Sequence, residues 1–260
     1  MTADRSKLAV RTPTFIAILG ELLLTSLGVN AVLVHTARRY VEETNAVRLD
    51  PAGLKVYATE RPMPRGNGPL LVLFGDSRAA MWPAPPTPTG YRVVNRGVGY
   101  QTTAQILLRL DKELAPLRPN VVVVEAGVND LKAIAEFPDR RDEIVADCKV
   151  NLARIVDECR RIGAAVVLVN VFGIGDVAFW RRPFWSPEVR VAVRDVNAFL
   201  PSLVREGVVL FDANAVLADP RGEIQRAYQV DYLHISPPGY AALNAALNQI
   251  LLPVLSTMAK

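Results

Sequence analysis

Four polar side chains in three separate regions of this 260-residue chain have types that could together perform nucleophilic catalysis. Ser77 is the first of them and stands in the turn Gly75-Asp76-Ser77, directly after the apolar run 70–74. A serine at a strand-to-helix turn can act as a nucleophile, because the free backbone N–H groups of a helix N-terminus stabilise a developing oxyanion. Serine is also a favoured N-cap residue, and an ordinary cap is the structural alternative.

His234 is the candidate base for Ser77, because the only other histidine, His35, lies at the end of an apolar N-terminal segment. Asp231 precedes His234 by three residues and can orient the imidazole by accepting a hydrogen bond from Nδ1–H. Asp231 could instead cap the closing helix. Asn129 follows another apolar run, where its side-chain amide can donate to an oxyanion or form a turn or helix cap.

Apolar runs alternate with segments of helical periodicity along most of the chain. We expect strands at 70–74, 91–94, 121–126, 165–171 and 208–211, and helices at 103–117, 144–162, 187–204 and 238–257. This alternation predicts βαβ units and a parallel five-stranded sheet with helices on both faces. Ligands bind at the carboxyl ends of the strands in such sheets, and the candidate residues follow predicted strands there.

The segment 15–36 is predominantly apolar and long enough as a helix to cross a bilayer core of about 30 Å. We therefore expect a basic N-terminal segment at 1–14, a transmembrane anchor at 15–36, a linker at 37–69 and one catalytic domain at 70–260. The distribution of Lys and Arg favours a cytoplasmic N-terminus and a soluble domain outside the membrane, on the periplasmic or extracytoplasmic side. A cleaved signal peptide, which would give a secreted protein, is the alternative.

Glu21 is unusual in this segment because a carboxylate at membrane depth costs several kcal/mol unless it is neutral or paired. Glu21, Thr25 and Gly28 share one helical face, and polar and small residues on one face suit packing against another membrane helix. The segment therefore predicts a membrane-protein partner, with a tolerated protonated glutamate as the alternative.

The composition excludes several classes of protein. The net charge of +4 is scattered without a basic block, which argues against nucleic acid as a partner. Cys148 and Cys159 lie eleven positions apart in one predicted helix and are too distant to form a disulfide. The sequence shows no metal-binding cluster or phosphate-binding loop, so we expect no metal and no cofactor.

The polar segments after the strands form four blocks in the order Gly75-Asp-Ser77, Asn95-Arg-Gly-Val-Gly99, Gly127-Val-Asn-Asp130 and Asp231-x-x-His234. In these blocks the chain resembles the SGNH hydrolases, or GDSL esterases and lipases, from about residue 70 onward. The resemblance implies a flavodoxin-like three-layer α/β/α sandwich. It also implies a catalytic triad and an oxyanion hole. The triad would be Ser77, His234 and Asp231, and the oxyanion donors would be the N–H of Ser77, the N–H of Gly99 or Tyr100, and the Asn129 amide. The α/β-hydrolase fold has the same residue order but needs a glycine where Ala79 stands.

Two residues depart from the family pattern. Tyr100 replaces a usual glycine in the second block, where a positive φ would be strained. Arg78 follows the nucleophile, where many relatives carry a neutral residue. It is predicted to bind an anionic substrate or to support Asp76, and an ordinary surface arginine is the alternative.

The loop 173–185 adds Trp180, Arg181 and Trp185, which we expect to bind a sugar ring or an acyl chain; a hydrophobic plug and a membrane-resting loop are the alternatives. The sequence thus predicts a membrane-anchored serine esterase that hydrolyses a small, acetyl-type ester, such as one on a carbohydrate. An O-acyltransferase acting on a glycan and a non-catalytic subunit of a membrane complex are the alternatives.

Overall fold

The computed structural model describes residues 5–59, 68–88 and 90–258, and the chain divides into two compact units after Pro51. The first unit is the helix α1 (Arg5–Leu49), in which Thr14–Leu49 is long and apolar enough to cross a membrane. A signal sequence has the same properties, so either role fits this helix. The helix continues past the expected anchor at 15–36, so the expected linker starts as helix. Residues 60–67 of the expected linker, which include Pro62, Pro64 and Gly66, lie outside the described residues.

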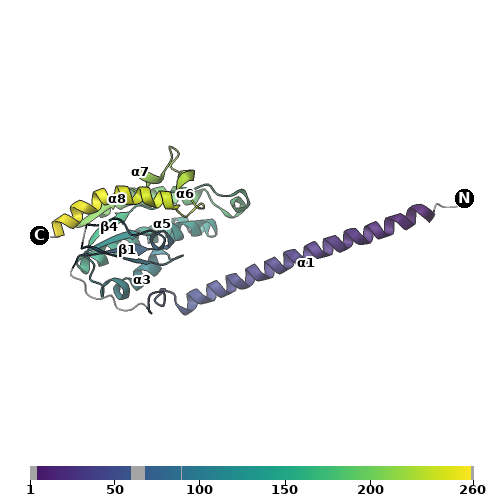
Figure 1. Ribbon diagram of the computed structural model, residues 1–260, viewed down its shortest axis with the longest axis horizontal. Coiled ribbons are helices and arrows are strands. Elements are labelled where there is room, and N and C mark those ends of the chain that lie inside the picture. Colours follow the sequence, from purple (N-terminus) through teal and green to yellow (C-terminus); the bar gives the residue numbers. More distant parts are fainter. Residues whose placement is uncertain (1–4, 60–67, 89, 259–260) are drawn as a thin grey trace. The chain divides into compact units, whose positions relative to one another are not determined.

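The second unit is built on one parallel sheet with the strand order β2-β1-β3-β4-β5 (Figure 1). The strands are β1 (Leu70–Gly75), β2 (Arg92–Gly97), β3 (Val121–Glu125), β4 (Ala165–Val169) and β5 (Val208–Phe211). β1 pairs with β2 and β3 in register, so that Gly75 lies between Gly97 and Glu125. This order is that of flavodoxin-like sheets, and it confirms the predicted three-layer fold.

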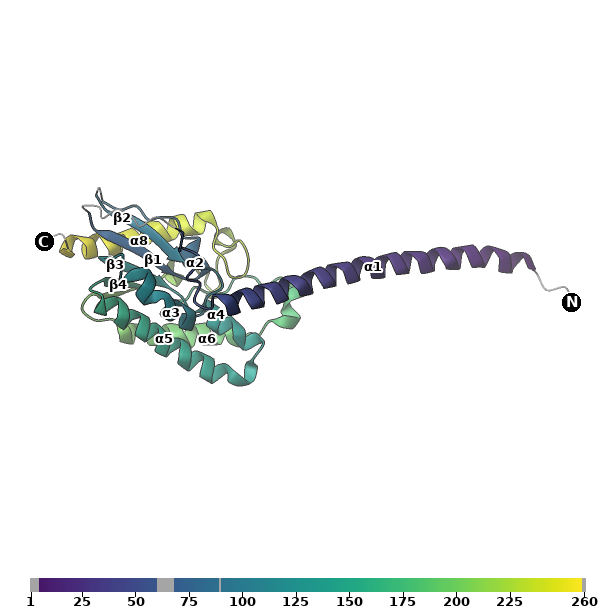
Figure 2. The same cartoon turned by 90° about the horizontal axis from the view of Figure 1, so that it is seen from below.

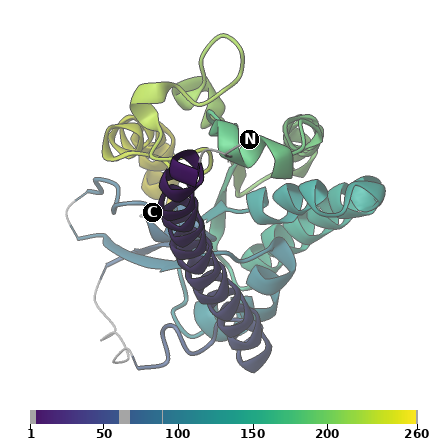
Figure 3. The same cartoon turned by 90° about the vertical axis from the view of Figure 1, so that its right-hand side faces the viewer.

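Helices cover both faces of the sheet, and alternate residues of β1 therefore belong to two separate cores. Leu70, Val72 and Phe74 pack with the helical layer of α3, α5 and α6, whereas Leu71 and Leu73 pack with α8. Figures 1 and 3 show α8 and the α3–α5 layer on opposite sides of the strands. The longer helices are α3 (Thr103–Leu114), α5 (Arg141–Arg161), α6 (Glu188–Phe199) and α8 (Pro237–Met258).

Short helical segments follow several strands. The α-helical turns are α2 (Ser77–Ala80), α4 (Val128–Lys132) and α7 (Asn214–Leu217), and the 3₁₀ segments are η1 (Ala133–Ala135), η2 (Pro138–Arg140), η3 (Phe179–Phe184), η4 (Leu200–Leu203) and η5 (Arg226–Tyr228). Figure 2 shows α2 and α4 together at the carboxyl end of the strands. The helix expected at 187–204 is divided into α6 and η4, because Pro201 has no N–H for a regular helical bond.

The globular unit begins at Ala52, earlier than the expected boundary at residue 70. The Ala52 carbonyl accepts a hydrogen bond from Gln101 Nε2 at 2.8 Å. Tyr57 donates its hydroxyl proton to the Gly97 carbonyl, and the Arg96 guanidinium lies 4.5 Å from the centre of its ring. The segment before β1 is thus attached to the second of the four sequence blocks.

Candidate active site

The turn after β1 places Ser77 at the start of α2 and leaves its hydroxyl free of any capping role. A Cβ atom on Gly75 would lie 1.7 Å from the Glu125 carbonyl oxygen, so only glycine fits where β1 and β3 meet. Asp76 is the N-cap of α2, and its carboxylate accepts the N–H of Arg78 at 2.9 Å. Ser77 is therefore the first helical residue rather than the cap, and its Oγ lies 3.2 Å from His234 Nε2.

Asp231 holds both the ring and the backbone of His234. Asp231 Oδ2 lies 2.8 Å from His234 Nδ1, while Oδ1 accepts the backbone N–H groups of Leu233 and His234 at 2.7 and 2.8 Å. Partial burial alone would raise the pKa of Asp231, but these hydrogen bonds outweigh it and lower that pKa below its usual value. The carboxylate thus orients the imidazole and does not cap α8, which begins at Pro237.

The prediction that Arg78 binds substrate is wrong, because its side chain is completely buried. Its Nε donates to the Leu233 carbonyl at 2.8 Å, and its Nη1 and Nη2 donate to the carbonyls of Phe172 and Gly173. Arg78 therefore connects α2, which begins at Ser77, to the loop of His234 and to the loop after β4. The sequence could not reveal this, because the carbonyl acceptors come together only in the folded chain.

Three backbone N–H groups and one side-chain amide are the candidate oxyanion donors. A Cβ on Gly99 would lie 3.9 Å from the Ser77 Cβ, so the second block packs directly against Ser77. Within the described part of the chain, the N–H groups of Ser77, Gly99 and Tyr100 donate to no protein acceptor. Asn129 lies inside α4, whose N-cap is Gly127, so it is not the helix cap. Its Nδ2 donates to the Gln101 carbonyl at 3.0 Å, which leaves its second N–H for a ligand.

Tyr100 adopts φ 65°, the left-handed conformation that the sequence indicated as strained for this position. This conformation costs a residue other than glycine about 1–2 kcal/mol. The ring is 83 % exposed, and the Lys132 ammonium lies 5.6 Å from its centre. Strain of this kind persists only where the surrounding structure holds the backbone in place.

Arg109 is a buried support that no sequence motif indicates. Its Nε donates to Gln101 Oε1, and its two terminal nitrogens donate to the carbonyls of Arg96 and Gly75 at 2.7 and 2.8 Å. Burial lowers the pKa of Arg109 to about 10. One side chain thus connects β1, β2 and the segment that carries the candidate oxyanion donors.

A pair of buried carboxyl groups lies beneath Ser77. Asp76 and Glu125 are at most 1 % exposed, and no donor among the described residues bonds Asp76 Oδ2 or either Glu125 oxygen. Burial raises the pKa of Glu125 well above its usual value, and the neighbouring Asp76 carboxylate adds to this. Since carboxylate oxygens only accept, one proton on Glu125 lets it donate a hydrogen bond to Asp76, which pairs two of these three oxygens.

Asp130 anchors the start of α3. Its oxygens accept the N–H and the hydroxyl of Thr103 at 2.9 and 2.6 Å, and burial raises the pKa of Asp130 to about 6. Since an unfolded aspartate titrates near pH 3.9, Asp130 binds a larger share of a proton in the folded chain than in the unfolded chain between about pH 4 and 6. The contribution of Asp130 to the free energy of unfolding therefore falls as pH rises through that window.

We expect Asp130→Asn to remove this contribution. The melting temperature of the variant minus that of the wild type should therefore rise between pH 4 and pH 7. Thermal melts of the full chain in detergent at four pH values measure the difference. Asp139→Asn, at an exposed carboxylate in η2, is the matched control. A difference between Asp130→Asn and wild type that is constant with pH would contradict the assignment.

The predicted substrate loop packs onto Tyr232, one of the two residues between Asp231 and His234. The Trp185 ring meets the Tyr232 ring edge-on at 5.1 Å, and the Arg181 guanidinium lies 5.2 Å from the centre of the same ring. Phe179, Trp180 and Phe184 of η3 are 63–80 % exposed. Trp180 and Arg181 thus face solvent beside the candidate site, while Trp185 is half-buried.

Comparison with known proteins places this arrangement in a family. Residues 73–242 match the model of the GDSL-like Lipase/Acylhydrolase family, so the chain belongs to that family and is a hydrolase. It is 28 % identical over 201 residues to platelet-activating factor acetylhydrolase IB subunit alpha1 of Pongo abelii, covering 72 % of this chain and 78 % of the relative.

Solved structures of low sequence identity share the fold. A putative acylhydrolase from Bacteroides fragilis aligns with a TM-score of 0.63 and 22 % identity over 79 % of this chain and 99 % of its own. An acetylxylan esterase from Geobacillus stearothermophilus aligns with a TM-score of 0.57 and 18 % identity over 74 % of this chain and 96 % of its own.

If Asn129 donates to the oxyanion, Asn129→Ala should lower kcat by about 10²–10³-fold with little change in KM, the usual cost of one such donor. Steady-state kinetics with 4-nitrophenyl acetate measure both constants. Asn151→Ala is the control, since Asn151 on α5 also donates its amide within the fold but bonds Thr103. A KM that rises about tenfold at constant kcat would make Asn129 a substrate-binding residue instead.

Proposed function

We propose that the chain is a membrane-tethered serine esterase that hydrolyses a small, acetyl-type ester through Ser77, His234 and Asp231. The observation that carries this proposal is the continuous hydrogen-bonded series from Ser77 Oγ through the His234 ring to Asp231. It lies at the carboxyl end of the parallel strands, where sheets of this type bind ligands.

The geometry supports a two-step acyl transfer. His234 Nε2 takes the proton of Ser77 as its Oγ attacks the ester carbonyl, and Asp231 stabilises the imidazolium that forms. The N–H groups of Ser77 and of Gly99 or Tyr100, with the Asn129 amide, stabilise the oxyanion. The alcohol leaves with the proton from His234, and water then attacks the acyl-serine by the reverse sequence of proton transfers.

The nature of the relatives favours a small acyl group, because one is an acetylhydrolase and one structural neighbour is an acetylxylan esterase. The exposed Trp180 and Arg181 beside the His234 loop suit a carbohydrate as the alcohol part of the ester. The small acyl group and its carbohydrate carrier are both part of the proposal.

The proposed tether is α1, whose apolar length exceeds a bilayer core. We place its N-terminus in the cytoplasm and the globular unit outside, following the positions of the basic residues. Glu21, Thr25 and Gly28 would then face a protein partner within the membrane, since an unpaired carboxylate in hydrocarbon is costly.

Hydrolysis of 4-nitrophenyl acetate by the full chain in detergent tests the proposed activity. The esterase should release 4-nitrophenol continuously, and a folded chain that releases none would support the non-catalytic subunit instead. Addition of a polysaccharide acceptor distinguishes an esterase from the O-acyltransferase alternative, because a transferase would form acetylated polysaccharide in preference to acetate.

A further inference from the structure

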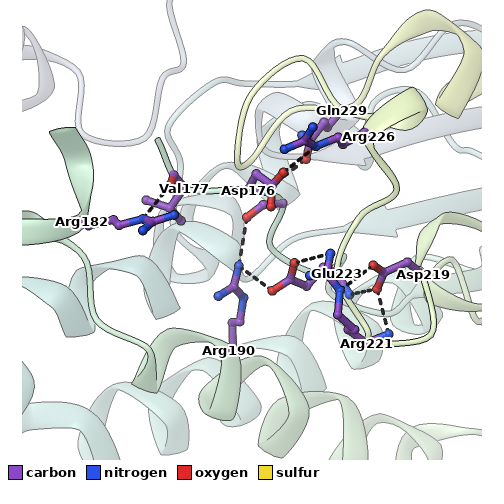
Figure 4. Close-up of polar contacts among 10 residues, drawn as sticks. Asp176, Val177, Arg182, Arg190, Asp219, Arg221, Glu223, Arg226 and Gln229 are labelled. Carbon is purple, nitrogen blue, oxygen red and sulfur yellow. Dashed lines mark hydrogen bonds and ion pairs between the residues drawn. The ribbon is translucent and has the colours of Figure 1, made fainter. Parts of the chain in front are cut away.

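A pocket with a volume of about 410 Å³ lies next to the candidate active site, between η3, α6 and the loop that follows α7. We call it the arginine pocket. Its principal lining residues are Asp176, Arg182, Trp185, Arg190, Arg221 and Glu223. Figure 4 shows that the three arginines approach it from three different segments of the chain.

The wall of the arginine pocket is continuous with the loop of the proposed triad. Gly175 N–H donates to the Tyr232 carbonyl at 3.0 Å, and Asp176 N–H donates to Gln229 Oε1 at 3.1 Å. The Trp185 ring, which lines the pocket, packs against the Tyr232 ring. Tyr232 is next to Asp231 in the chain, so the pocket adjoins the loop that carries Asp231 and His234.

The carboxylates of the pocket already have arginine partners. Asp176 pairs with Arg226 at 2.9 Å, and Glu223 pairs with both Arg190 and Arg221 at 3.2 Å (Figure 4). Arg182 pairs with no carboxylate among the described residues, and the one hydrogen bond of its guanidinium there is a long one of 3.5 Å from Nε to the Val177 carbonyl. The pocket thus has a surplus guanidinium, whose planar donors match a carboxylate or phosphate group.

Two further donors of the lining residues are unsatisfied. Arg190 Nε and Trp185 Nε1 are closed to water and reach no acceptor among the described residues. A buried donor without a partner destabilises a fold, so an acceptor that bonds such a donor stabilises the fold.

We propose that the arginine pocket binds an acidic sugar, through a carboxylate or phosphate group held by Arg182 and its neighbours, and thereby selects esters of acidic carbohydrates for Ser77. This inference rests on the proposed esterase function, because the bound sugar is the alcohol part of the ester. The Trp185 ring offers an apolar surface to the sugar, while Asp176 and Glu223 accept hydrogen bonds from its hydroxyl groups.

Direct binding tests the pocket without relying on activity. The full-length Ser77→Ala chain in detergent is titrated calorimetrically with glucuronate, glucose 6-phosphate and glucose. At least one of the two anions should bind at least about tenfold more tightly than glucose. Introducing Arg182→Gln into the Ser77→Ala chain should remove that preference. The anion that binds more tightly identifies the carboxylate or the phosphate as the recognised group.

Arg140→Gln is the matched control, since Arg140 is an exposed arginine of η2 that pairs with Glu143 and does not line the pocket. This variant should keep the preference for the anion. Equal binding of glucose and both anions, or an anion preference that persists in Arg182→Gln, would overturn the proposal.

Kinetics then separate the pocket from the proposed function. In the otherwise wild-type full chain, the ratio of kcat/KM for acetylated glucuronate over acetylated glucose should fall about tenfold or more in Arg182→Gln, mostly through KM. A chain that binds the anion but hydrolyses neither ester would contradict the esterase function and leave the anion site standing. A chain that hydrolyses both esters with a ratio unaffected by Arg182→Gln would contradict the role of the pocket in substrate selection.

Discussion

Ser77→Ala should lower the rate of ester hydrolysis by about 10⁴-fold or more, because no other hydroxyl in the described site bonds His234. The fold should be unaffected, since Asp76, and not Ser77, caps α2. Turnover of 4-nitrophenyl acetate and a thermal melt of the same detergent-solubilised sample measure the two effects. The double variant Ser77→Ala/His234→Ala should be no slower than the single one, because residues that act as a unit are not additive.

Ser202→Ala is the control for Ser77→Ala, because Ser202 is an exposed serine of η4 whose hydroxyl donates to the Phe199 carbonyl, far in sequence from the four blocks. It should retain full activity. Residual activity of Ser77→Ala near the wild-type level would exclude Ser77 as the nucleophile and move the search to another side chain.

Asp231→Asn should have the next largest effect, a fall in kcat of up to about 10⁴-fold. An asparagine amide donates to Nδ1 and favours the tautomer with the proton on Nε2, so the ring can no longer accept from Ser77. The asparagine oxygen can still accept the backbone N–H groups of Leu233 and His234, so the loop should keep its shape. Steady-state kinetics should show the loss in kcat with KM little changed.

The stability of Asp231→Asn separates catalysis from structure. The folded chain lowers the pKa of Asp231, so the carboxylate stabilises the fold above about pH 4 and loses this contribution as pH falls through the lowered value. Asp231→Asn should therefore melt slightly below the wild type at pH 7 and approach it in acid. Asp212→Asn is the control, because Asp212 also accepts a backbone N–H in a turn but lies after β5. Loss of activity no greater than in that control would leave Asp231 with a structural role only.

The strands and the polar segments after them could be predicted from the sequence because each leaves a local signal. A continuous apolar run such as 121–126 indicates a strand buried on both faces, and the block Asp231-x-x-His234 places an acid within reach of the only downstream histidine. The structure confirms the parallel sheet and the family. The catalytic roles of Ser77, His234, Asp231 and Asn129 stay proposals, which the short distances at the site support.

The buried residues that hold the site together give no comparable signal in the sequence. Arg78 and Arg109 are ordinarily surface residues, and their complete burial depends on backbone carbonyls that converge from separate loops. The attachment of Ala52 to Gln101 likewise joins segments far apart in the sequence. A pattern of apolar periodicity reports which residues enter a core, but it does not report where free carbonyl oxygens meet.

Covalent labelling with a fluorophosphonate tests the central claim most directly, because the reagent reacts with a serine only where a base and an oxyanion hole activate it. The full chain in detergent is treated, digested and sequenced by mass spectrometry, with Ser77→Ala and Ser202→Ala treated in parallel. The account predicts one phosphonyl group on Ser77 in the wild type and in Ser202→Ala, and none in Ser77→Ala. A folded wild-type chain that takes up no label, or takes it up on another residue, would contradict it.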